Sequence, residues 1–322
     1  MIEACGASGP SSGHSHGSAS LTQTSGKRIA VDTWVKRLNS FVALDPGTLS
    51  QSESGGLLTL DKQVVELNRA QGNQENQYQP TGKVDWVAYA AKAPQMEELA
   101  RIEETWVPAP GTSVSKFSDD ELVVFSRPSV KGSWRASAMV TLAAAPSAEM
   151  TELRGFGGRL PAASQKKLPI APEALPAAYQ SYIQGAANSH FAPGQFTDVQ
   201  RNQFAAGRTS GSSQGVAVSY QLGPGRVEGV YGLPEGNALV FFTTSFTEVY
   251  TANPNTCMQQ VSSAPNFPPI VPDGRYQSVH VQKESGVLAV EDPSTSTITI
   301  IQDSSYPSLK ASTTPATAPI CL

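Results

Sequence analysis

Both halves of the chain place helical segments before a run of strand segments, and this order restricts the fold more than any other feature. In the first half, residues 28–44 have apolar side chains at the spacing of one helical face, and residues 61–71 predict a second helix. The second half begins in the same way, with helices predicted over residues 172–187 and 197–207. Helices followed by runs of strands indicate an α+β protein and not a doubly wound parallel sheet.

The predicted strands are short and separated by glycine, proline or polar turn residues. Residues 96–107 fit a helix in their first part and a strand in their second, and we favour the strand. The run ALVFF at 238–242 has the length of a buried strand. The last three strands alternate apolar and polar residues, which is typical of an antiparallel meander. The predicted strands cover residues 83–91, 96–107, 121–128, 133–142, 214–223, 226–233, 237–251, 276–282, 286–292 and 296–303.

A length of 322 residues is that of about two domains. Residues 146–171 show no clear period and contain several prolines and a glycine cluster, so they are the best candidate for a boundary. The sequence therefore predicts a disordered tether (1–27), an N-terminal α+β domain (28–145), a linker (146–171), a C-terminal α+β domain (172–303) and a C-terminal tail (304–322).

The composition restricts the partners of the chain. Hydrophobic residues make up 39% and charged residues only 16%, with a net charge of −4 and no basic cluster. A surface that follows nucleic-acid phosphates needs clustered Lys and Arg, so nucleic-acid binding is not expected. No stretch reaches the roughly 18–20 apolar residues of a membrane span. The many neutral polar residues suit an extracellular protein.

The N-terminal residues suggest where the protein resides. Residues 6–26 have almost no hydrophobic side chains and predict a disordered tether. A cysteine followed by such a tether resembles the start of a mature bacterial lipoprotein, in which Ala4 and Ile2 fit the preceding positions and Glu3 departs from the pattern. The resemblance implies lipid on Cys5, an extracytoplasmic location and attachment to the membrane. A secretory signal also needs a longer apolar stretch than the four residues before Cys5. The alternative is a free cysteine in a disordered cytosolic tail.

Two further cysteines, Cys257 and Cys321, lie in the second half of the chain. If the protein is exported, these two can oxidise to a disulfide, which leaves Cys5 for the lipid. Such a bridge would hold the Pro/Thr-rich C-terminal end against the domain. The alternative is a pair of free thiols.

The motifs that suggest catalysis lie in the wrong structural context. Residues 13–17 and 211–215 both match G-x-S-x-G, but neither follows a strand and precedes a helix, as a nucleophile elbow requires. His14 and His16 lack the further ligands that a metal site needs. The glycines at 155–158 lack the context of a dinucleotide loop. We therefore expect no catalytic residues, no metal and no cofactor.

Three phrases of the sequence carry a family resemblance. They are VVELNRAQG…YQP, ELVVFSRPSVKGSWRAS and LPAAYQSYIQGAA…FAPGQFTD, and they resemble an actinobacterial secreted lipoprotein family of unknown function over residues 28–303. The order of two helices and a run of antiparallel strands also resembles the cystatin-like, nuclear-transport-factor-like fold. The resemblance implies two cystatin-like domains, each with a helical N-terminal part packed on an antiparallel sheet. It implies no catalytic residues.

Folds of this type often keep a pocket between helix and sheet, and aromatic residues could line it. The four tryptophans, Trp34, Trp86, Trp106 and Trp134, all lie in the first half. They are either the core of that half or, in part, the lining of a cavity. His190 begins a loop and could lie at the mouth of a pocket or only anchor the loop. The candidate pocket residues are therefore Trp34, Trp86 and His190.

Three functions are compatible with these features. The first is an envelope-anchored lipoprotein that binds an envelope protein or a small apolar ligand without catalysis. The second is a hydrolase or isomerase with a buried Asp, Tyr or His in a small pocket. The third is an assembly component in which residues 237–251 offer a strand edge to a partner.

Overall fold

The computed structural model describes residues 23–70, 78–80, 85–90, 97–108, 117–129, 131–142, 158–213, 215–261, 268, 270–305, 310–317 and 320–321. These residues form helices and antiparallel sheets, so the predicted α+β class is confirmed. The predictions for residues 1–22, including Cys5, lie outside the described residues, as do most of the linker and the predicted end of the second helix at residue 71.

The first unit has helices followed by a sheet that is five-stranded in its described part. Strands β1, β3, β4 and β5 follow one another in space, and β2 also pairs with β3. All of these pairs are antiparallel. The elements are α1 (Gln23–Val42), α2 (Pro46–Leu49), α3 (Gly55–Ala70), β1 (Tyr78–Pro80), β2 (Asp85–Ala90), β3 (Glu97–Pro108), β4 (Phe117–Ser126) and β5 (Arg135–Thr141).

The second unit is built around two long strands, β8 and β10, which pair with each other along their length. On the other side of β8 lie β6 and β7, and on the other side of β10 lie β11 and β12. The helical elements are α4 (Ala162–Gln165), η2 (Pro172–Ala174), α5 (Leu175–Ile183), η3 (Gln195–Val199), α6 (Gln200–Ser213) and η4 (Pro234–Gly236). The strands are β6 (Val216–Leu222), β7 (Arg226–Gly232), β8 (Ala238–Ala252), β9 (Thr256–Gln260), β10 (Gly274–Asp292), β11 (Thr297–Ser305), β12 (Lys310–Pro315) and β13 (Ile320–Cys321).

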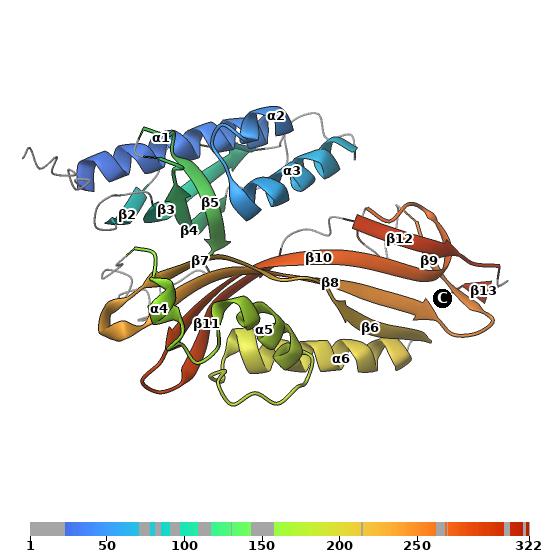
Figure 1. Ribbon diagram of the computed structural model, residues 1–322. Coiled ribbons are helices and arrows are strands. Elements are labelled where there is room, and N and C mark those ends of the chain that lie inside the picture. The colour runs from blue at the N-terminus through green and yellow to red at the C-terminus, as the bar shows by residue number, and fades with distance from the viewer. Residues whose placement is uncertain are drawn as a thin grey trace, which may run out of the picture.

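The layers are stacked as helix, sheet, sheet and helix (Figure 1). Helices α1 and α3 cover the outer face of the first sheet, and α5 and α6 cover the outer face of the second. The inner faces of the two sheets pack on each other through a shared apolar cluster, which we call the seam. The seam contains Leu99, Leu122, Val124, Ala138, Val140, Leu142, Tyr231, Leu233, Leu239, Phe241 and Leu288.

The side chains of β4 are apolar on both faces because the strand lies between two packed layers. Leu122 and Val124 point into the seam, whereas Val123 and Phe125 point toward α1 and α3. All four side chains are fully buried. The run ALVFF at the start of β8 is buried on both faces in the same way, which confirms its interpretation as a buried strand. Continuous apolar runs in this chain therefore mark the strands that lie between two packed layers.

Several predicted boundaries were wrong. The segments predicted as separate strands at 276–282 and 286–292 are one strand, β10. Residues 283–285 continue its pairing with β8, opposite residues 244–246. Lys283 is tolerated there because it forms an ion pair of 2.8 Å with Glu248. The predicted tail also adds strands to the second unit, since β12 pairs with β10 and β13 pairs with β9.

The helix starts differ from the prediction as well. α1 begins at Gln23, within the predicted tether, and α3 begins at Gly55. The helix predicted from residue 197 is preceded by η3, and α6 itself begins at Gln200. The Thr197 hydroxyl donates to the carbonyl of Ala192, and the Asp198 carboxylate accepts from the hydroxyl of Tyr182, because a π-helical turn precedes α6.

Candidate functional site

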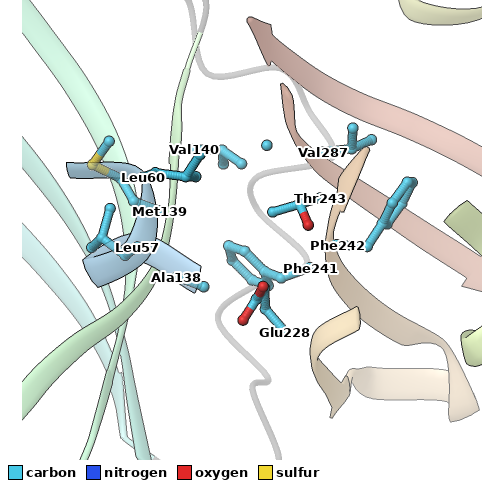
Figure 2. A pocket seen from close by; sticks show the side chains of 11 residues that line it. Leu57, Leu60, Ala138, Met139, Val140, Glu228, Phe241, Phe242, Thr243 and Val287 are labelled. Carbon is cyan, nitrogen blue, oxygen red and sulfur yellow. The ribbon is translucent and has the colours of Figure 1, made fainter. Parts of the chain in front are cut away.

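A recess opens in the seam, between the first unit and the second sheet (Figure 2). Its volume is about 270 Å³ when the open space at its mouth is included, and its enclosed part has room for about one water molecule. Leu57 and Leu60 of α3 line one side, and Phe241 and Thr243 of β8 line the other. The lining is therefore apolar apart from Thr243 and one carboxylate.

That carboxylate belongs to Glu228 of β7, and it connects the two units. It accepts a hydrogen bond of 3.2 Å from the backbone N–H of Gly56, in the first turn of α3. It also accepts one of 2.7 Å from Nε of Arg226. A negative charge near a helix N-terminus satisfies a free N–H group and interacts favourably with the helix dipole. A Cβ at residue 56 would overlap the ends of the Glu228 and Arg226 side chains, so a larger residue there would displace them from this contact.

Two further polar contacts cross between the units. Arg159 donates 3.0 and 2.7 Å hydrogen bonds to Glu97 of β3, although its own side chain is 59% exposed. The hydroxyl of Ser304 on β11 donates to the backbone carbonyl of Thr141, 2.9 Å away. The exposed ion pair contributes little to the stability of the fold, so the seam depends mainly on its apolar cluster.

Glu98 of β3 is a buried ionisable residue of the first unit. Its side chain is fully buried, neither carboxylate oxygen has a hydrogen-bond partner, and Phe125 lies opposite it in the sheet. Burial raises the pKa of Glu98 to about 7. Unpartnered buried polar groups are rare in proteins and often mark a functional site.

A second buried carboxyl group lies in the helical layer of the first unit. Glu53 lies 3.1 Å from Nε of Arg37, whose Nη2 donates to Asp61 at 2.6 Å, and the guanidinium is stacked 4.4 Å from the ring centroid of Trp34. Burial, together with the nearby charge of Asp61, raises the pKa of Glu53 to about 9. Arg37 therefore holds two buried carboxyl groups together in the helical layer, which fits a structural role.

The second unit has a buried polar cluster beneath α5. The hydroxyl of Tyr179 lies 2.7 Å from the carbonyl of Phe196 and 2.7 Å from Oδ2 of Asp303, and Gln200 donates to the same oxygen at 3.0 Å. Burial raises the pKa of Asp303 against the opposing effect of these hydrogen bonds. A phenol has one proton and a carbonyl only accepts. The hydroxyl of Tyr179 can therefore donate to only one of its two acceptors at a time, the carbonyl of Phe196 or the carboxyl group of Asp303.

The predicted pocket residues do not meet at one place. Trp34 is fully buried in α1 and packs edge-on against Phe125, which fits the core interpretation of this tryptophan. Trp86 lies in β2, opposite Ile102 in the register, and its side chain is not among those described. His190 lies beside β11 of the second unit, where Nδ1 is 2.9 Å from the carbonyl of Ser296. The recess is in the seam, and none of these three residues lines it.

The C-terminal cysteines lie next to each other in the fold. Cys257 of β9 is fully buried, and Cys321 of β13 is its direct partner in the parallel register. No group of three or more His, Cys, Asp or Glu residues in the described part of the chain is placed to hold a metal. Among the described helices, none is both long enough and apolar enough to cross a membrane.

Glu98, Glu228 and Asp303 were not predicted from the sequence as site residues. Glu98 lies in the run EELARIEE, where the many charges are typical of a solvated surface. One signal was available. Leu99, Ala100 and Ile102 are apolar residues of a strand that is covered on both faces, and a charged residue in such a strand is either buried or lies at the end of the strand. Nothing local to Glu228 indicates its contact with Gly56.

The fold defines a class of α+β proteins in which two antiparallel sheets share a core and helices cover their outer faces. The chain belongs to the family described as a domain of unknown function (DUF8094), which matches residues 21–299. This match begins before α1 and ends within β11, so it includes both sides of the seam. A comparison with curated proteins finds no match.

Proposed function

We propose that the chain is an envelope-anchored lipoprotein that acts as a non-catalytic binding or interaction module made of two cystatin-like units. Support for two such units comes from the order of elements, since helices precede the strands in each unit and cover one face of its sheet. Support for anchoring comes from Cys5 and the polar segment that follows it. The actinobacterial origin is part of the same proposal and rests on the sequence resemblance alone.

One observation supports the non-catalytic role. Among the residues that line the recess, Glu228 alone is ionisable, and its carboxylate is already bound by Gly56 and Arg226. General acid–base catalysis needs a titratable group that reaches the substrate. The recess therefore offers an apolar surface and no available acid or base. A small apolar ligand would fit only if the seam opens, so an envelope protein is the favoured partner.

We also propose that Cys257 pairs with Cys321. The side chain of Cys257 is fully buried, and the residue opposite it in the parallel register is Cys321. Disulfides persist in oxidising compartments, so this bridge supports an extracytoplasmic location.

Membrane fractionation tests the anchoring. The wild-type chain should sediment with membranes and be released by detergent, whereas Cys5→Ser should stay in the soluble fraction. Ser8→Ala, in the same N-terminal segment, is the matched control, because it changes one side chain there and keeps the lipidation residue. The same distribution for all three chains would contradict the anchor.

Glu98 favours the alternative function, a small-pocket hydrolase or isomerase. Its unpartnered carboxyl group has a pKa of about 7, a value suited to proton transfer at neutral pH. The alternative would be supported by turnover of an activated ester that Glu98→Gln abolishes without changing the melting temperature. We expect no turnover above that of a denatured control.

A further inference from the structure

The outer edge of β6 is open in the described part of the structure. One side of β6 pairs with β8 from Val216 opposite Ala252 to Leu222 opposite Phe246. None of the described strands pairs with the other side. In Figure 1 this edge lies next to α6, away from the first unit.

Three hydrogen bonds establish which backbone groups of β6 face outward. Asn253 donates to the carbonyl of Gly215, and Gly223 donates to the carbonyl of Ser245, so the odd-numbered positions bond toward β8. The carbonyl of Tyr220 instead accepts from the side chain of Gln184, at 3.4 Å. Because the direction alternates along an antiparallel strand, the N–H and C=O groups of Val216, Val218 and Tyr220 point away from the sheet.

The other edge strands of the second unit are either covered by another segment or contain residues that discourage pairing. The edge of β7 is covered by residues 158–160, where Arg159 bridges to Tyr231. The edge of β11 is covered by residues 190–192, where Phe191 bridges to Ile298. Strand β12 contains a lysine and a proline, which discourage pairing with another strand. Strand β6, with the sequence VAVSYQL, has no charge or proline, and no described strand or bridge pairs with its outer edge, although the side chain of Gln184 donates to the outward carbonyl of Tyr220.

We propose that β6 pairs antiparallel with β6 of a second copy of this chain, about a twofold axis at Val218. Val218 then lies opposite Val218 of the second copy, and Val216 lies opposite Tyr220 of the second copy. Each of these pairs exchanges two hydrogen bonds, as in a regular antiparallel ladder, and the carbonyl of Tyr220 accepts from the second copy in addition to, or in place of, the long hydrogen bond from Gln184. The two large sheets become one continuous sheet. This inference does not depend on the proposed lipid anchor.

The chemistry of the strand favours a second copy over a charged partner. β6 carries no charge, so self-pairing brings no like charges together along the strand. A β-branched residue opposite an aromatic residue, as in the Val216–Tyr220 pair, is favourable across strands. The nearest charges, Arg208 over the Tyr220 ring and Glu248 opposite Tyr220 on β8, have opposite signs. Since the paired stretch is short, we expect a dimer with a dissociation constant of roughly micromolar size.

Analytical ultracentrifugation of the full chain over a concentration series tests the proposal. The wild type should dimerise, and Val218→Pro should raise the dissociation constant at least about tenfold, because proline removes an outward N–H without breaking a bond to β8. Ser312→Lys, on exposed β12, is the matched control and should leave the dissociation constant unchanged. Circular dichroism and the melting temperature verify that each variant is folded.

Cysteine cross-linking tests the register even if Val218→Pro does not fold. In a Cys5→Ser background, Val218→Cys should form a covalent dimer on mild oxidation, because the two residues would lie opposite each other at about 5.5 Å between Cα atoms. Ala217→Cys should not, because Ala217 would lie opposite Ser219. A wild type that stays monomeric, a dimer that Val218→Pro leaves unchanged, or equal cross-linking of the two cysteine variants would each overturn the proposal.

Discussion

Glu228 of β7 accepts a hydrogen bond from the backbone N–H of Gly56, which is 172 residues earlier in the chain and on the opposite side of the seam. The helix start of α3 is therefore completed by a residue of the second unit. This contact joins the first sheet's helical layer to the second sheet, and it explains why a helix begins at two glycines, which are poor helix formers.

Removing this contact should destabilise the protein measurably. Glu228→Ala leaves the N–H of Gly56 without its partner, and we expect a loss of about 1 kcal/mol in the free energy of unfolding, as for other lost N-terminal caps. Glu228→Gln keeps an acceptor oxygen and should lose less. Urea unfolding at fixed pH measures both values. Equal losses for the two variants would show that the hydrogen bond to Gly56 is not what matters.

The stability of the fold should fall as the pH rises from about 5 to about 8. Glu98 and Glu291 are fully buried with a pKa raised by burial to about 7, so the native state holds more protons than the unfolded state above pH 4.5. Their contribution is complete below the unfolded pKa and is lost as the pH passes through about 7. The loss per group is on the order of 3 kcal/mol. Thermal unfolding across this pH range measures it, and a midpoint that rises with pH would contradict the account.

A neutral residue at position 98 should remove part of this pH dependence. Glu98→Met replaces an unpartnered buried carboxyl group by an apolar side chain of similar length, so it should stabilise the protein at pH 8 more than at pH 5. Glu66, on α3, is the matched control, since it is exposed, and Glu66→Met should leave the pH profile unchanged. Parallel profiles for Glu98→Met and the wild type would mean that Glu98 is charged in the folded protein.

The hydrogen-bond arrangement around Asp303 should tolerate an amide better than the loss of the phenol. Asp303→Asn keeps a side-chain oxygen that can accept from Tyr179 and Gln200, so we expect a change of about 1 kcal/mol or less. Tyr179→Phe leaves the buried carbonyl of Phe196 and Asp303 without their shared partner and should cost about 1–3 kcal/mol. Chemical unfolding of both variants gives the comparison. A larger loss for Asp303→Asn than for Tyr179→Phe would show that the carboxyl group contributes more to this cluster than the phenol does.

Reduction should destabilise the protein if Cys257 pairs with Cys321. In the chain-entropy description, a closed loop of this length contributes about 4 kcal/mol. The melting temperature should fall with a thiol reductant in the wild type and should not respond in the double variant Cys257→Ser, Cys321→Ser. A peptide map under non-reducing conditions identifies the pair directly. Two separate free peptides would rule out the bridge.

The sequence predicts the elements better than it predicts their contacts. ALVFF in β8 and ELVVF in β4 are continuous apolar runs, and both are buried on two faces as such runs suggest. The break predicted between 282 and 286 was wrong, because Lys283 looks like a turn residue until Glu248 is known to pair with it. The prediction that residues 237–251 offer a free edge was also wrong, because β8 lies between β10 and β6.

Less of the candidate site than of the fold could be predicted from the sequence. Glu228 and Gly56 depend on a contact between residues far apart in the chain, which no local pattern encodes. Glu98 resembles a surface residue because its neighbours Glu97 and Arg101 are charged and each is satisfied by a partner from another segment. Whether a residue on the outer face of a sheet is buried depends on which helices cover that face. This is decided by the tertiary packing and not by the local sequence.

The central claim, an envelope-anchored module, is tested most directly by the mass of the N-terminal peptide of the protein isolated from its native cell. The account predicts a peptide that begins at Cys5 and carries a diacylglyceryl group on its sulfur. A peptide in which Cys5 is unmodified and lies inside the chain would contradict the anchor and the location outside the membrane. In that case the reason for proposing a Cys257–Cys321 bridge from export would also be lost, and Glu98 would become the first residue to test for catalysis.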